Sequence, residues 1–229
     1  TFVHLDGSHL LVNIGMYMLI VPLLFALSVA NQNRRQFYVV FLTFLFAFPF
    51  VLSYLNLAIF RPSAGFGFSG VLMAFVGYLP VALAEYLDGL FDIGPADQTA
   101  PLLFLLSLGC ISALNLPSVS MVSSVLKLAL VISVGIAMAA VLLYALELYN
   151  QQEASQSKLR TVFQTPEYFE LALSAIVLLF AAQFVAFPPS PSLESGVLNL
   201  YVHFVGYALG FLVIFTTVEL AERFGWKQT

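Results

Sequence analysis

Long apolar segments alternate along this chain with short breaks that are polar or rich in proline and glycine. A helix needs about 20 mainly apolar residues to cross a bilayer, whereas the strands of a membrane barrel read as alternating segments of about 10 residues. The apolar segments have the helical length, so we expect them to be membrane-spanning helices. They cover residues 8–30, 37–60, 67–88, 101–116, 121–149, 168–187 and 197–222.

Positively charged residues decide whether the short fourth segment, 101–116, counts as a span. Lysine and arginine collect in loops on the cytoplasmic side of a membrane. If segment 101–116 spans the membrane, one side of the membrane carries Arg34, Arg35, Lys158, Arg160, Arg223 and Lys227. The other side receives Arg61, together with Lys127 near the outer end of the fifth helix. We therefore expect about seven transmembrane helices in the cell membrane, with the C-terminus in the cytoplasm, Thr1 outside and an earlier helix missing before it.

Composition agrees with an all-α polytopic membrane protein. Hydrophobic residues make up 61% of the chain and charged residues 9%, whereas a soluble domain carries about 25% charged residues. We expect one domain over residues 1–229, with the lipid bilayer as a partner. The net charge of −4 provides no basic patch, so nucleic acid is not an expected partner. The only cysteine, Cys110, excludes a disulfide within the chain.

Polar side chains lie near the outer ends of the first, third and seventh predicted helices, which run in the same direction. His9 and Asn13 are four residues apart, so they share one face of the first helix. Ser69 lies at the start of the third helix, and His203 lies roughly 9 Å into the seventh. Polar groups at this depth are costly unless they face protein or water, which makes them functional candidates.

These side chains have the chemistry for peptide-bond cleavage. Ser69 would attack the carbonyl carbon, and His203 would accept its proton near neutral pH. The oxyanion would be stabilised by backbone N–H groups at the start of the serine helix, around Gly67, and by the side chains of His9 and Asn13. No aspartate or glutamate is placed to orient His203, because the glutamates of the third, fifth and seventh helices lie toward inner ends: Glu85, Glu147, Glu219 and Glu222. We therefore expect a Ser/His dyad rather than a triad.

Each candidate also has a purely structural explanation. A serine between glycines is typical of close helix packing, and a membrane histidine commonly forms an interhelical hydrogen bond. The side chains of His9 and Asn13 are suited to capping a helix or to lying among lipid headgroups. Small residues on the two other helices predict close packing in either case, namely Gly70, Ala74 and Gly77 in the third and Gly206 and Gly210 in the seventh.

Three motifs together resemble the rhomboid family of intramembrane serine proteases. His9-x-x-x-Asn13, preceded by His4, is similar to the start of the family's second helix. The segment Gly67-Phe68-Ser69-Gly70 is similar to its nucleophile motif, and His203-x-x-Gly206-x-x-x-Gly210 to its base motif. The motifs occur in the family's order and at one depth, and the resemblance covers about 1–90 and 197–222 of the chain.

The resemblance implies a rhomboid-like helical bundle that cleaves transmembrane protein substrates near the outer leaflet. It implies that Ser69 is the nucleophile, that His203 is the general base, and that His9 and Asn13 are oxyanion donors. It also implies that no metal or cofactor is used. The preferred substrate would be a transmembrane helix with an unstable stretch near its outer end.

The chain departs from the family pattern at several positions. Met73 stands where an aromatic residue often packs on the histidine, and Phe68 replaces a small residue. Ser69 and His203 are 134 residues apart, although one intervening helix with its loops needs only about 50 residues. We therefore expect two additional spans within 91–196, which keeps both catalytic helices running in the same direction.

Two other functions remain open. A rhomboid-like protein that binds transmembrane clients without cutting them would also carry these motifs, and Phe68, Met73 and the insertion favour it. A small transporter would show inverted repeats or charges near the midplane of the membrane. No repeat relates the two halves of the chain, and its charges cluster toward helix ends.

Overall fold

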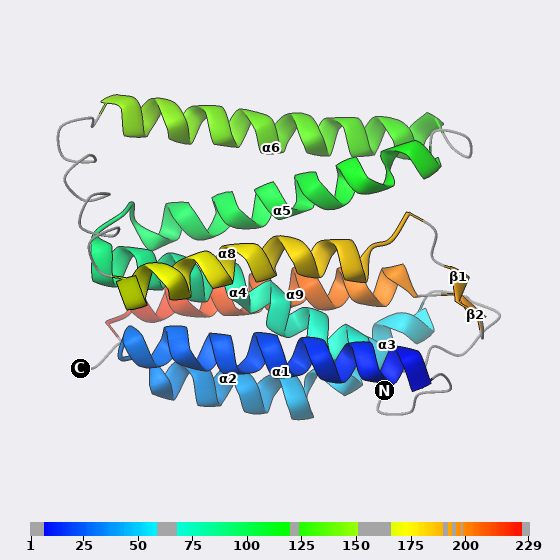
Figure 1. The fold of residues 1–229 in the computed structure, drawn as a ribbon, viewed down its shortest axis with the longest axis horizontal. Coiled ribbons are helices and arrows are strands. Elements are labelled where there is room, and N and C mark those ends of the chain that lie inside the picture. The colour runs from blue at the N-terminus through cyan, green and yellow to red at the C-terminus, as the bar shows by residue number, and fades with distance from the viewer. Residues whose placement is uncertain are drawn as a thin grey trace. The chain divides into compact units, whose positions relative to one another are not determined.

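The computed structural model describes residues 7–58, 68–119, 124–150, 166–189, 192–193, 196–197 and 199–225. This part of the chain is almost entirely helical (Figure 1). Six of its helices are long and apolar enough to cross a membrane, and a bent pair raises the number to seven if it forms one span. The prediction of an all-α polytopic bundle is thereby confirmed.

Most helices lie close to the predicted segments. Their bounds are α1 Gly7–Ala30, α2 Arg34–Phe46, α3 Phe48–Ala58, α4 Ser69–Phe91, α5 Ala96–Val119, α6 Ser124–Asn150, α8 Pro166–Ala186 and α9 Leu200–Arg223. Two short strands, β1 Ser192–Leu193 and β2 Gly196–Val197, pair antiparallel before α9. The described residues divide into two compact units. Unit 1 contains those of 1–82 and 192–229, unit 2 contains those of 83–191, and the expectation of a single domain stays a prediction.

The second predicted helix, 37–60, is broken in the structure. α2 begins earlier, at Arg34, and α3 leaves it at an angle of 44°. The break lies at Ala47, whose N–H donates to Thr43 O over 2.8 Å. Pro49 follows in the first turn of α3, where its ring and its missing N–H favour a kink at this point.

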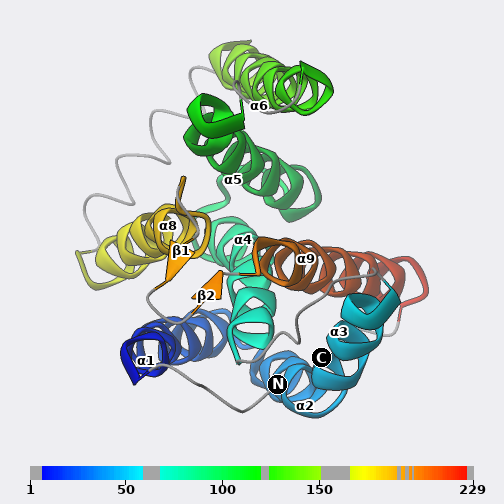
Figure 2. The ribbon, with the colours of Figure 1, turned by 90° about the vertical axis from the view of Figure 1, so that its right-hand side faces the viewer.

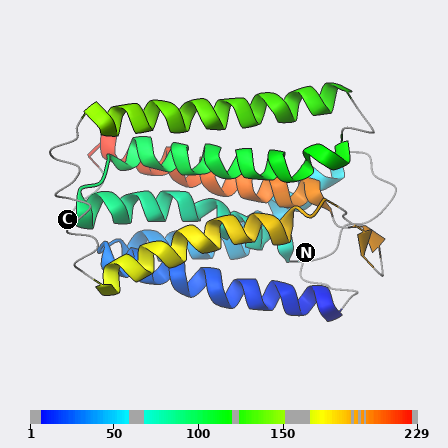
Figure 3. The same ribbon diagram turned by 45° about the horizontal axis from the view of Figure 1, so that its top comes forward.

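In unit 2, α5 is longer than the predicted segment 101–116 because a side chain caps its polar first turn. Asp88 Oδ2 accepts a hydrogen bond from Ala96 N over 3.1 Å, which satisfies one of the donors that a helix start leaves open. α5 then runs beside α6 (Figure 3). Ser112 Oγ donates to Ser133 Oγ over 3.0 Å between these two helices.

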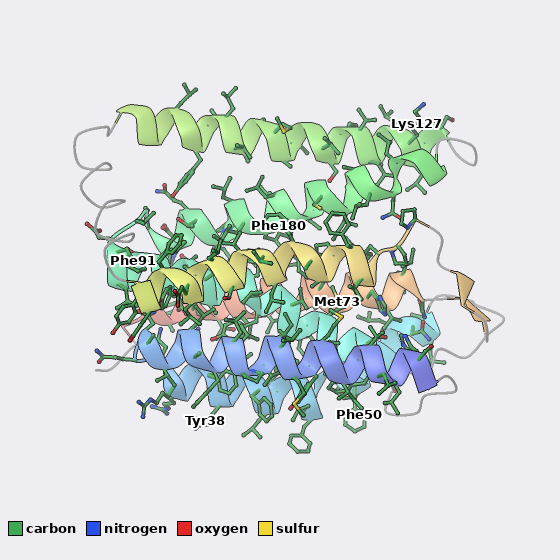
Figure 4. All side chains as sticks on the ribbon, viewed as in Figure 1. Tyr38, Phe50, Met73, Phe91, Lys127 and Phe180 are labelled. Atoms are coloured by element: carbon green, nitrogen blue, oxygen red, sulfur yellow. The ribbon has the colours of Figure 1, made fainter. Side chains whose placement is uncertain are left out.

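The first part of α4 forms the core of unit 1. Every residue from 69 to 78 is buried, and Figure 2 shows this part of α4 surrounded by α1, α2, α3 and α9. On the outer helices, by contrast, Tyr38 and Phe50 point away from the bundle (Figure 4) and are 53% and 74% exposed. Large apolar side chains that face outward are typical of a helical bundle surrounded by lipid.

A polar contact joins three helices at the other end of unit 1. The hydroxyl of Tyr78 on α4, which is fully buried, lies 3.5 Å from Ser28 Oγ on α1. The same hydroxyl accepts a hydrogen bond from Gln36 Nε2 on α2 over 3.4 Å. Since lipid offers these groups no water, the contact stabilises the arrangement of α1, α2 and α4.

Replacing Tyr78 by phenylalanine should therefore lower the free energy of unfolding by about 0.5–1.5 kcal/mol. The ring stays in place, so only the hydroxyl contacts are lost. The measurement is reversible unfolding in mixed detergent micelles. Tyr54→Phe is the matched control, because Tyr54 is 79% exposed on α3 and its replacement should leave unfolding unchanged. Equal effects of the two variants would contradict the stabilising role of the Tyr78 contact.

Candidate functional site

Glycines bring the backbones of α4 and α9 into direct contact. Gly206 lies against the carbonyl group of Gly70, and a methyl group added to Gly206 would overlap that oxygen. One turn further along, a methyl group on Gly210 would lie 2.7 Å from Ala74 Cα. Gly77 in turn faces the carbonyl oxygen of Tyr207. The five small residues named from the sequence therefore lie along one contact between the two helices.

This contact places Ser69 and His203 at the same end of the helix pair. Ser69 begins α4 next to Gly70, and His203 lies in the first turn of α9, about one turn before Gly206. Val202, the neighbour of His203, also packs on Gly70, with its carbonyl oxygen 3.5 Å from a methyl group placed there. Both candidate side chains are buried, Ser69 at 9% and His203 at 4% exposure, and Nε2 of the imidazole is enclosed by protein.

The polar face of α1 approaches the same end of α4. Asn13 is only 5% exposed and His9, one turn earlier, is partly buried. One turn after Asn13, the ring of Tyr17 packs edge-on against Phe68, with ring centroids 5.9 Å apart. Because Phe68 directly precedes Ser69, α1 contacts the start of the serine helix. In Figure 1, α1, α9 and the first part of α4 all begin on the same side of unit 1.

Of the two unusual residues in the motifs, Met73 is part of the core, whereas Phe68 is only partly buried. Phe68 fills the space beside Tyr17, and so takes part in the packing of α1 on α4. Met73 lies in α4, one turn after Ser69 (Figure 4), and is 1% exposed. Gly67 and His4 lie outside the described residues. The participation of Gly67 in an oxyanion site therefore stays a prediction.

Two asparagines that the sequence reasoning did not single out organise the start of α9. Asn199 is the N-cap of α9, and its Oδ1 accepts a hydrogen bond from Val202 N over 3.3 Å. Its Nδ2 donates to Oδ1 of Asn56 on α3 over 2.9 Å. An asparagine before a long apolar run is a typical cap, and an asparagine inside a span is costly without a partner. These two patterns could have identified Asn199 and Asn56 from the sequence.

The charged side chains that the structure describes in unit 1 lie at the end opposite the candidate site. Arg34 and Arg35 begin α2, and Arg223 ends α9, where its Nε lies 3.9 Å from Glu219 Oε2. Glu219 follows His203 by about 24 Å along the helix. Four other lysines and arginines from which the membrane orientation is predicted lie outside the described residues: Arg61, Lys158, Arg160 and Lys227.

The candidate site of unit 1 thus contains a hydroxyl, an imidazole and a carboxamide from three helices, with no acidic group on α9 near the imidazole. Within the described part of the chain, no group of three or more His, Cys, Asp or Glu side chains could hold a metal ion. Comparison with protein-family models, curated proteins and solved structures found no match to this chain. The resemblance to rhomboid proteases therefore rests on the three motifs themselves.

Proposed function

We propose that this chain is an intramembrane serine endopeptidase that cleaves transmembrane proteins near the outer face of the bilayer. The contact of Gly206 with Gly70 carries the proposal, because it leaves no room for a side chain between the helices that hold Ser69 and His203. A nucleophile and a base at one level of two touching helices are the minimum for acyl transfer. Burial of both side chains supports a reaction in a confined site, protected from bulk water.

In this mechanism Ser69 Oγ attacks the scissile carbonyl carbon while His203 accepts the hydroxyl proton. The resulting imidazolium then gives this proton to the leaving amine, and water hydrolyses the acyl-enzyme by the reverse sequence of proton transfers. The oxyanion accepts hydrogen bonds from backbone N–H groups at the start of α4 and from the side chains of Asn13 and His9 on α1. No residue in these steps needs a metal or a cofactor.

The same placement suggests the substrate and the orientation in the membrane. Ser69 and His203 lie at helix starts, at the end of unit 1 away from Arg34, Arg35 and Arg223. If these arginines face the cytoplasm, the site lies in the outer leaflet and the C-terminus lies inside. A substrate must expose a peptide bond there, so a transmembrane helix with residues that unwind easily near its outer end is the best fit.

The test is cleavage of a reporter transmembrane substrate by the purified full-length protein in detergent and in proteoliposomes. Wild type is compared with Ser69→Ala and His203→Ala, each checked for a monodisperse folded state. Loss of cleavage in both variants supports the dyad. Cleavage that persists in both rules out this site.

Other outcomes would favour other functions. If wild type binds transmembrane substrates but leaves them intact across a panel of sequences, the chain is a client-binding protein. Solute flux in proteoliposomes that survives Ser69→Ala would instead favour a small transporter.

A further inference from the structure

α3 contacts the starts of both candidate catalytic helices through one of its faces. Leu52 and Asn56 are four residues apart and therefore lie one turn apart on the same face. Leu52 is 2% exposed, and its Cδ1 lies 3.2 Å from a methyl group placed on Gly70, next to Ser69. Asn56 accepts the hydrogen bond from Asn199 at the start of the histidine helix.

The hydrogen bonds lead from α3 to the backbone of His203 through a single residue. Asn199 donates its Nδ2 to Asn56 Oδ1 over 2.9 Å and uses its own Oδ1 to accept from Val202 N over 3.3 Å. The carbonyl oxygen of Asn199 accepts from His203 N over 3.3 Å. Because the amide of Asn199 is planar, fixing its nitrogen on Asn56 also fixes the oxygen that caps the first turn of α9.

We propose that Asn56 is a positioning residue that sets the place of His203 relative to Ser69, acting through Asn199. This inference rests on the proposed protease function of the dyad. Leu52 packs α3 against the serine helix, and Asn56 binds the histidine helix by a hydrogen bond. One turn of α3 therefore contacts both helices and fixes their relative position. Catalytic geometry is sensitive to displacements of about 1 Å, which cost as much as 100-fold in rate.

The break at Ala47 explains how a short helix performs this role. A continuous helix from α2 would follow the direction set by the packing of α2, whereas the 44° bend gives α3 a direction of its own. The α2–α3 bend thereby directs Leu52 toward the start of α4 and Asn56 toward the start of α9. The hydrogen bond between Asn56 and Asn199 also satisfies polar groups that would lack partners in lipid.

The test compares two substitutions of nearly equal size in the full-length protein. Asn56→Asp keeps the acceptor oxygen for Asn199 Nδ2, and Asn56→Leu removes it. For Asn56→Leu we expect kcat for the reporter substrate to fall about 10- to 100-fold, with KM unchanged. Asn56→Asp should stay within about threefold of wild type, because the charge-assisted bond replaces the neutral one. A merely structural role would not separate kcat from KM in this way.

A second readout does not depend on substrate binding. The rate at which a fluorophosphonate labels Ser69 reports activation of the hydroxyl by His203, and it should fall in Asn56→Leu by the same factor as kcat. Asn115→Leu is the matched control. This asparagine lies on α5 in unit 2, where its Nδ2 donates to Ile111 O over 2.9 Å, and its replacement should leave labelling of Ser69 unchanged.

The outcomes separate this inference from the proposed function. If wild type shows cleavage and labelling and Asn56→Leu leaves both unchanged, the positioning role is overturned and the dyad stays intact. The same conclusion follows if Asn56→Asp and Asn56→Leu reduce cleavage and labelling equally. Absence of both cleavage and labelling in wild type would overturn the protease function and the positioning role with it. If Asn56→Leu yields no folded protein, Asn56→Ala removes the same acceptor without adding apolar volume and is measured in its place.

Discussion

Replacing Ser69 by alanine should lower the rate of reporter cleavage by roughly 10⁴- to 10⁶-fold, and His203→Ala should lower it by a similar factor. The nucleophile and its base act in a single step, so removal of either one removes covalent catalysis altogether. The measurement is kcat/KM for a transmembrane reporter, with rates followed long enough to detect the residual activity. Both variants delete atoms from buried positions without adding volume, so the helix contacts at Gly70 and Gly206 should persist.

The double variant makes this expectation sharper. If Ser69 and His203 form one functional unit, the double alanine variant should be no slower than Ser69→Ala alone, because the second substitution removes nothing that is still working. Ser107→Ala serves as the control. Like Ser69, Ser107 is a buried serine of an apolar helix, but its Oγ donates to Phe104 O over 2.6 Å within α5. Its loss should not affect cleavage. Multiplicative losses in the double variant would contradict a dyad.

The long helices were predictable because a bilayer imposes length and apolar composition on every span. α1 and α4 lie within a few residues of the predicted segments. α5 extends beyond its apolar run since its cap comes from Asp88, a polar residue of the preceding helix, and hydropathy does not reveal such a partner. The bend at Ala47 did have a signal in Pro49, but proline also occurs inside the unbroken helix α4, at Pro80.

The candidate site was predictable only as far as short motifs extend. Glycine spacing indicated the contact faces of α4 and α9, since small residues are what membrane helices need for close approach. The bond between Asn56 and Asn199 joins positions 143 residues apart. No local pattern tells which polar group in one helix meets which group in another. For the same reason, the start of α9 was placed at residue 197 rather than after the cap at Asn199.

A single added methyl group at Gly206 should damage the site, because it separates the helices that carry Ser69 and His203. The Cβ of Gly206→Ala would overlap the carbonyl oxygen of Gly70 and lie 3.0 Å from its carbonyl carbon. Backbone atoms cannot rotate out of the way as a flexible side chain can, so α9 must move away from α4. We expect the free energy of unfolding to fall by about 1–3 kcal/mol. The cleavage rate should fall by more than the loss of folded protein accounts for, because the separation of the helices also moves His203 away from Ser69.

Gly15→Ala is the matched control for this variant, because Gly15 also lies inside a transmembrane helix of unit 1 but has no atom within 4 Å of an added methyl group. Alanine is the better helix former, so Gly15→Ala should unfold no more easily than wild type. Unfolding in mixed micelles and reporter cleavage are measured on both variants. A Gly206→Ala protein with wild-type stability and cleavage would show that α4 and α9 are not in backbone contact. The geometry that brings Ser69 and His203 together would then have to be abandoned.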